Sequence, residues 1–246
     1  MTPEFLLGAW PIIRFAEIDS TNEEARRRAV SGDTGPCWLV TDAQTAGRGR
    51  LGRQWSSPIG NLFATALLPY PRPAAEATVV PFAAGLAVVD AARMAGVDVG
   101  SLGLKWPNDV LAGQAKLSGT LIETGLLHGQ LWMAAGFGVN VEVAPERSDR
   151  PTACLVNLPG GTGLTAPRLL TLLDLAFRAR LNQLLTEGFA GVRADWLACA
   201  AYLNASIEVN GLKGIMTGLA DDGALMLCAD DGTVTRVRAG EISLLS

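Results

Sequence analysis

Lysine and histidine are scarce in this chain of 246 residues, which contains 20 Lys and Arg side chains together but a single His. The only lysines are Lys105, Lys116 and Lys213. Because arginine is the default cation here, each lysine marks a position where a compact ammonium group can be preferred to a planar guanidinium. The single histidine, His128, precedes Gly129 in a predicted hairpin turn, so we interpret it as a surface residue rather than a catalytic one.

Other absences narrow the class of protein further. The four cysteines have no CxxC spacing and lie in apolar or strand-like contexts, so buried free thiols are expected rather than disulfides or metal ligands. A net charge of −4 does not provide the basic face that general nucleic-acid binding needs. The sequence has neither a signal-peptide pattern at its start nor an apolar run of about 18 residues. We therefore predict a cytoplasmic protein without nucleic-acid or membrane partners.

Hydrophobic patterning predicts an α+β domain over residues 1–203, with a mixed sheet flanked by helices. Strands are expected at 10–18, 37–41, 61–68, 102–105, 117–125 and 131–143, and helices at 21–30, 77–95, 167–186 and 191–202. Ser20 and Thr21 each precede a glutamate by three positions, which predicts a capping box at the start of the first helix. Residues 144–166, rich in Pro, Gly and Thr, are interpreted as a surface loop of little functional information.

The pattern changes after residue 203. Short alternating strands are separated by Asn-Gly at 210–211 and by Asp-Gly at 222–223 and 231–232. These pairs are strong hairpin signals, since both residues tolerate the positive φ of a tight turn. Residues 204–246 are therefore expected to form a small β-barrel domain.

The segment QTAGRGRLGRQWSSP, residues 44–58, alternates glycines with Arg48, Arg50 and Arg53 and contains no acid. Such a loop can wrap backbone N–H groups and guanidinium groups around a phosphate or carboxylate. Its glycines also satisfy the dinucleotide fingerprint G-x-G-x-x-G, but a strand rather than a helix is expected to follow, and residues 67–75 contain no acid. The Rossmann interpretation is rejected, and a flexible basic turn remains the alternative to an anion site.

A second segment carries two of the three lysines. It reads KWPND at 105–109 and KLSG at 116–119, so two ammonium groups, an amide and a carboxylate surround a tight turn between strands. Trp106 and Pro107 are better explained as residues of a packed turn than as residues that take part directly in a reaction. An exposed strand cation is the alternative for Lys116, but the scarcity of lysine favours a functional role.

Taken together, these motifs resemble those of one family. EIDSTN at 17–22, the loop at 44–55, KWPND, KLSG and GFGVN at 136–140 occur in the order found in bacterial-type biotin–protein ligases, and GLADDGAL at 218–225 is similar to their C-terminal barrel. The resemblance implies a class II synthetase-like biotin/lipoate ligase fold with a small SH3-like β-barrel. It also implies ATP and biotin as substrates, Mg²⁺ held mainly by the ATP phosphates rather than by protein ligands, and a biotin carboxyl carrier domain as partner.

The implied reaction has two steps, formation of biotinyl-5′-AMP and transfer of biotin to a lysine of the carrier. The resemblance implies catalytic roles for Lys116, Arg48, Arg50 and Asp109. Lys116 would bridge the biotin carboxylate and the phosphate, the two arginines would hold phosphate oxygens and order the loop, and Asp109 would orient the acceptor lysine.

Binding roles follow from the same resemblance. Biotin would be bound by Ser20, Thr21, Asn22, Gln44, Arg48, Gly49, Arg50 and Lys116, and the adenylate by Gly47, Arg53, Trp55, Lys105, Asn108 and Asn140. Trp55 would pack beside the adenine and Asn140 would contact its edge. Ser20 or Thr21 can also cap a helix, and the two roles are compatible because a cap leaves the helix N-terminus open to a ligand.

Three departures from the family pattern and two other functions are considered. Thr120 stands where relatives often have isoleucine, and no basic residue occurs near Ala205. Only about ten residues precede the first predicted strand, so a DNA-binding role of the kind found in repressor relatives is not expected. A lipoate or octanoate transferase would not need the ureido partners at 20–22 and 44, and a non-catalytic sensor would not need Lys116 with the loop arginines. Either a monomer or a homodimer is compatible with the sequence.

Overall fold

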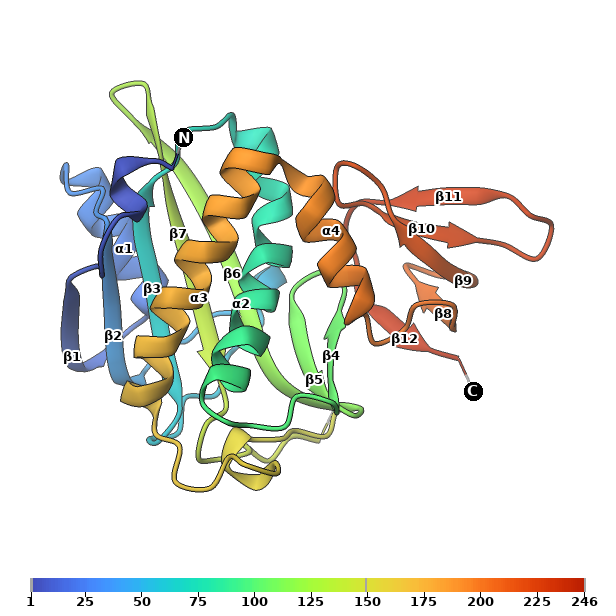
Figure 1. Ribbon diagram of the computed structural model, residues 1–246, viewed down its shortest axis with the longest axis horizontal. Helices are drawn as coiled ribbons and strands as arrows, with labels where there is room; N and C mark the ends of the chain where they lie inside the picture. Colours follow the sequence, from blue (N-terminus) through green and yellow to red (C-terminus); the bar gives the residue numbers. More distant parts are fainter. Residues whose placement is uncertain (1, 149, 246) are drawn as a thin grey trace.

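A computed structural model of the chain describes residues 2–148 and 150–245, which form a helix-flanked mixed sheet and a second, smaller sheet (Figure 1). The larger sheet consists of β1 (Ile12–Ile18), β2 (Cys37–Gln44), β3 (Leu62–Pro69), β4 (Leu102–Lys105), β5 (Asp109–Ala112), β6 (Ala115–Leu127) and β7 (Gln130–Val139). Its strand order is β1-β2-β3-β7-β6-β5-β4, with β1 and β2 parallel and the other neighbours antiparallel. The predicted α+β class is confirmed.

One face of this sheet is covered by α2 (Val80–Met94) and α3 (Ala166–Glu187), which lie together across the strands (Figure 1). Alternate strand residues that face these helices, among them Trp38, Ala64 and Phe137, pack into this main core. The segment Ala74–Met94 is apolar and long enough to cross a membrane, but 67% of its most apolar window is buried inside the protein. A core helix that packs on a sheet explains this composition.

The opposite face is covered only in part, by α1 (Thr21–Val30). Strand residues of the other parity, such as Leu39 and Ala134, pack under α1 in a small second core. Gly136 and Gly138 continue the row of Ala134 along β7, because alternate residues of a strand share a face. In the described part of the chain, no helix covers this face of the sheet beyond the N-terminus of α1. There the two glycines leave the surface of β7 without side chains.

The C-terminal unit is a five-stranded antiparallel sheet consistent with a small barrel. Its strands are β8 (Ser206–Val209), β9 (Leu212–Leu219), β10 (Leu225–Cys228), β11 (Val234–Val237) and β12 (Ile242–Leu244), in the order β11-β10-β9-β8-β12. The Asn-Gly and Asp-Gly pairs occupy the three predicted hairpin turns, with positive φ at Asn210 and at each glycine. The buried Trp106 indole donates to the Gly223 carbonyl (3.0 Å), which joins this unit to the turn before β5.

Several element boundaries differ from the prediction. The strand β5 was not predicted, because its four residues follow the Pro107 turn directly. A 3-10 turn, Ala74–Val79, precedes α2, which starts at Val80 with Pro81 in its first turn. The fourth helix, α4 (Phe189–Ala198), begins two residues earlier and ends four residues earlier than expected. All four cysteines are free as predicted, but only Cys37 and Cys154 are fully buried.

Candidate active site

A pocket lies on the α1 face of the large sheet, over the part that α1 leaves uncovered. Its walls come from the N-terminus of α1, the loop between β2 and β3, strands β4 to β7, residues 145, 147, 150 and 152 after β7, and the two residues before β12. Of the predicted site residues, it brings together Ser20, Thr21, Asn22, Gln44, Arg48, Gly49, Arg50, Arg53, Trp55, Lys105, Asn108, Asp109, Lys116 and Asn140. Gly47 is the exception. It is buried within the loop itself, where a Cβ on Gly47 would lie 2.8 Å from the Trp55 carbonyl oxygen.

The predicted capping box at the start of α1 is wrong. Ser20 is the N-cap residue, but no side-chain capping bond forms there. The Gln44 Oε1 atom instead accepts from the Thr21 backbone N–H (2.9 Å) and lies 3.3 Å from its hydroxyl. The cap is thus supplied by the end of β2, and this contact fixes two predicted biotin-binding residues against each other.

Asn22 is held by two strands at once, β3 and β6. Its Oδ1 accepts from the Thr65 hydroxyl (2.7 Å), while its Nδ2 donates to the Leu121 carbonyl (3.2 Å) and to Glu123 Oε2 (2.7 Å). Gly136 makes room for it, since a Cβ there would lie 2.1 Å from Asn22 Oδ1. The amide therefore serves to lock α1 to β3 and β6, and this supports the polar end of the pocket.

The three loop arginines have different partners. Arg48 Nη2 donates to Glu23 Oε2 (2.9 Å), whereas Arg53 forms an ion pair with Glu241 of the C-terminal unit. Arg50 Nη1 donates only to the Asn108 amide oxygen (3.2 Å) among the described residues. Burial lowers the pKa of Arg50, and the charges of Asp109 and Glu241 raise it only in part. In the described part of the chain no carboxylate forms an ion pair with Arg50.

The Trp55 ring packs against the backbone of two glycines, Gly119 and Gly138. Added Cβ atoms would lie 2.5 Å from its ring at Gly138 and 3.1 Å at Gly119. The Lys116 ammonium is 5.3 Å from the ring centroid, within the range of a cation–π contact. The indole Nε1 is buried without a hydrogen-bond partner among the described residues. A planar donor of this kind in a pocket wall is suited to a ligand that offers an acceptor.

Lys116 and Asp109 form the most buried ion pair in the pocket. Their atoms Nζ and Oδ1 are 2.6 Å apart, and the side chains are 18% and 11% exposed. Burial lowers the pKa of Lys116, and Asp109 offsets this in part. The backbone of Lys116 is fixed by hydrogen bonds with Pro151 and Ala153, and the Asn140 amide donates to its carbonyl (3.3 Å). The ammonium is thus placed rigidly at the centre of the pocket.

The sequence did not reveal every residue of the pocket. The segment 144–166 was interpreted as uninformative, yet Pro145, Arg147, Arg150 and Thr152 line the site. Glu241 reaches it from the C-terminal unit and also accepts from Arg150 (3.2 Å). Glu123 was missed as well; it does not line the pocket, but it holds Asn22 from β6. No local pattern marks Arg150 or Glu241, because both contacts join parts of the chain about 90 to 190 residues apart.

The fold and this cation-rich pocket define a class of ligases that activate a carboxylic acid with a nucleotide, and comparison with known proteins identifies the family. The model of the biotin/lipoate A/B protein ligase family matches residues 15–135. A biotin–[acetyl-CoA-carboxylase] ligase of Paracoccus denitrificans is 40% identical over 221 residues, which cover 86% of this chain and 92% of that protein. Another from Mycobacterium tuberculosis is 33% identical, covering 92% and 86%.

A solved structure gives the same result. The biotin protein ligase from Aquifex aeolicus in complex with biotin and ATP matches with a TM-score of 0.78 and 27% identity, over 96% of this chain and 98% of that one. The chain belongs to the biotin protein ligases. The resemblance drawn from the sequence motifs is confirmed, and so is the corresponding fold.

A pH effect is expected from Lys105, whose pKa is lowered by burial and raised only in part by Asp109 and Glu241. An anionic ligand favours the charged ammonium and raises this pKa again, so ATP binding should take up protons between the lowered pKa and the ligand-bound one. Affinity for ATP should therefore fall as pH rises through this interval. Calorimetry over a series of pH values below the ordinary pKa of lysine, in buffers of different ionisation enthalpy, measures the uptake. Lys105→Met should bind up to about one proton fewer than the parent, and an unchanged uptake would contradict the assignment.

Proposed function

We propose that the protein activates biotin with ATP to biotinyl-5′-AMP and then transfers biotin to a specific lysine of a biotin carboxyl carrier domain. The observation that best supports this is the buried Lys116–Asp109 pair at the centre of a pocket whose loop carries Arg50, which has only an amide partner among the described residues. The relatives named for acetyl-CoA carboxylase support a carboxyl carrier as the acceptor.

In the first step, a biotin carboxylate oxygen attacks the α-phosphorus of ATP and pyrophosphate leaves. Two anions must approach each other, so fixed cations that interact most strongly with the developing charge lower the barrier. Lys116 is proposed to contact both the carboxylate and the α-phosphate. Arg50 is proposed to hold phosphate oxygens, since its charge has no carboxylate partner within 4 Å among the described residues.

In the second step, the acceptor lysine attacks the carbonyl of the mixed anhydride, an amide forms and AMP leaves. The attacking amine must be neutral, and the proton that it loses as the amide forms passes to solvent. Asp109 is proposed to orient this amine from its place beside Lys116. Closure of the loop over the adenylate would exclude water, which would otherwise hydrolyse the anhydride.

The substrate-binding assignments are proposals with the following support. Thr21 and Gln44 lie at the polar end of the pocket with Ser20, where hydroxyl and amide groups suit a ureido ring. Trp55 is proposed to pack beside the adenine, with Gly47 and Gly49 shaping the loop beneath it. Asn108 holds Arg50 in place.

A metal ion is expected to enter with ATP. No group of three His, Cys, Asp or Glu side chains suited to a metal occurs in the described part of the chain, and Asp109 is already paired with Lys116. The ATP phosphates would therefore provide most ligands of Mg²⁺. We also propose a cytoplasmic enzyme that acts as a monomer or homodimer without nucleic acid.

Biotin-dependent exchange of ATP with labelled pyrophosphate tests the first step, with lipoate and octanoate measured in parallel. We expect exchange with biotin alone. Exchange with lipoate or octanoate alone would assign the protein to the other branch of the family. Absence of exchange with all three acids would instead favour a non-catalytic binding protein. Labelling of a carrier domain, with its acceptor lysine changed to arginine as the control, tests the second step.

A further inference from the structure

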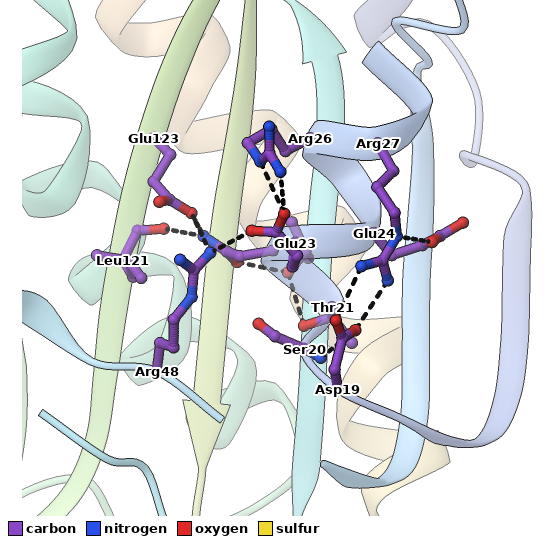
Figure 2. A network of polar contacts seen from close by, with 12 residues as sticks. Asp19, Ser20, Thr21, Glu23, Glu24, Arg26, Arg27, Arg48, Leu121 and Glu123 are labelled. Atoms are coloured by element: carbon purple, nitrogen blue, oxygen red, sulfur yellow. Dashed lines mark hydrogen bonds and ion pairs between the residues drawn. The ribbon is translucent and has the colours of Figure 1, made fainter. Parts of the chain in front are cut away.

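The Arg48 side chain is directed at two carboxylates on the scaffold, as Figure 2 shows. Its Nη2 atom is 2.9 Å from Glu23 Oε2 and 3.7 Å from Glu123 Oε2. Glu23 belongs to the first turn of α1 and Glu123 to β6, so one loop residue bridges two elements that flank the polar end of the pocket.

The two carboxylates are fixed without the loop. Asn22 donates to Glu123 (2.7 Å), and Arg26, one turn along α1, forms an ion pair with Glu23. The pKa of Glu23 is lowered, chiefly by its hydrogen bonds from Arg26 and also by the nearby charge of Arg48. A preformed pair of like charges favours a cation between them. Glu23 and Glu123 therefore form an acidic receptor for a loop cation.

The pairing of Arg48 separates it from the other loop arginines. Arg53 ties the far side of the loop to Glu241 of the C-terminal unit, and Arg50 between them has an amide as its only partner among the described residues. The loop is thus held at both ends by ion pairs. Arg50, which has no carboxylate partner among the described residues, lies between them. This division of roles suits Arg48 and Arg53 to hold the loop in place and Arg50 to meet an anion.

We propose that Glu23 and Glu123 are positioning residues for the ligase reaction, forming an acidic latch that holds Arg48 and keeps the loop closed over bound biotinyl-5′-AMP. This inference rests on the proposed function. It places the contribution of Arg48 in retention of the intermediate, acting through the two glutamates. The expected role of Arg48 as a phosphate contact becomes the competing explanation.

The size of the effect follows from exposure. The Arg48 side chain is 42% exposed and those of Glu23 and Glu123 are 20% and 36% exposed. Ion pairs at this exposure are individually weak and screened by salt. Each single substitution should therefore speed release of the adenylate about two- to threefold, and loss of both carboxylates about tenfold.

The variants are Glu23→Gln, Glu123→Gln and the double change. Glutamine keeps an oxygen for Asn22 at position 123, so only charge is removed there. Glu17→Gln is the matched control, because Glu17 is an exposed acid on β1 with no ion pair among the described residues. The enzyme is loaded with biotinyl-5′-AMP, and its release is followed at low and high salt. Pyrophosphate exchange at saturating substrates and thermal unfolding are measured on the same samples.

We expect the double variant to release biotinyl-5′-AMP faster, while pyrophosphate exchange at saturating substrates changes less than twofold. High salt should speed this release in the parent and should have no effect on it in the double variant. Arg48→Met should speed release about tenfold in the parent and less than twofold in the double variant, since the partners are already gone. A full additional effect of Arg48→Met, or release unchanged in the double variant, would overturn the latch. A parent that forms no adenylate would overturn the proposed function, and with it this inference.

Discussion

Changing Lys116 to alanine is expected to lower biotin-dependent pyrophosphate exchange by about 10³-fold, because a preorganised charge at the reacting phosphate is lost. The same change leaves the Asp109 carboxylate, 11% exposed, without its cation. Stranding a buried charge in this way should destabilise the protein by about 3 kcal/mol. Activity and stability would fall together in this variant, so a second variant is needed to separate them.

That second variant adds Asp109→Asn to Lys116→Ala. The neutral amide removes the stranded charge, so the melting temperature should recover most of its loss while exchange stays near background. Lys213→Ala serves as the control, since Lys213 is 68% exposed on the C-terminal unit. Exchange close to that of the parent in the folded double variant would show that Lys116 is not the central cation.

Arg50→Met is expected to lower kcat/KM for ATP about 10²-fold and, at the same time, to leave the free protein as stable or slightly more stable. The reason is that Arg50 is a half-buried cation whose only described partner is the Asn108 amide, so its charge costs free energy until an anion arrives. Loss of activity with a gain of up to about 1 kcal/mol in the free energy of unfolding would identify a cation kept for binding.

Arg178→Met is the comparison for this experiment. Arg178 pairs with Asp174 in the core (2.9 Å) and does not line the pocket, so its loss should reduce stability and spare the chemistry. Denaturant unfolding and steady-state kinetics on both variants give the contrast. A clear loss of stability in Arg50→Met would instead mean that Arg50 supports the loop structurally.

The sequence predicted the large-scale architecture because each part carried its own local signal. Apolar runs marked the strands of the large sheet, and the Asn-Gly and Asp-Gly pairs marked all three hairpin turns of the C-terminal unit. The prediction was less accurate near prolines: β5, which directly follows the Pro107 turn, was missed, and α2, with Pro81 in its first turn, begins three residues later than predicted. In those places the local signal for a turn outweighs the weaker signal of the element that follows.

The capping box shows the limit of local patterns most clearly. Thr21 and Glu24 have the correct spacing, but Gln44 from the end of β2 takes the Thr21 N–H, and Glu24 pairs with Arg27 and Arg28 instead. For Ser20 and Glu23, the Ser20 N–H donates to Asp19 Oδ1 (2.7 Å), and Glu23 pairs with Arg26 and Arg48. A capping box is a contact within one turn of helix, so a partner brought in by β2 can replace it without any change in the helix itself.

The sequence by itself determined which chemical groups are available to this protein: a basic glycine-rich loop, two lysines beside one turn, and a polar start to α1. The tertiary structure decided how the charges are shared. In the folded protein Arg48 pairs with Glu23 and Glu123, and Arg53 pairs with Glu241. Arg50 has no carboxylate partner among the described residues. Three similar arginines in one loop cannot be distinguished by local pattern, because their roles depend on carboxylates that only the packing of distant segments brings within reach.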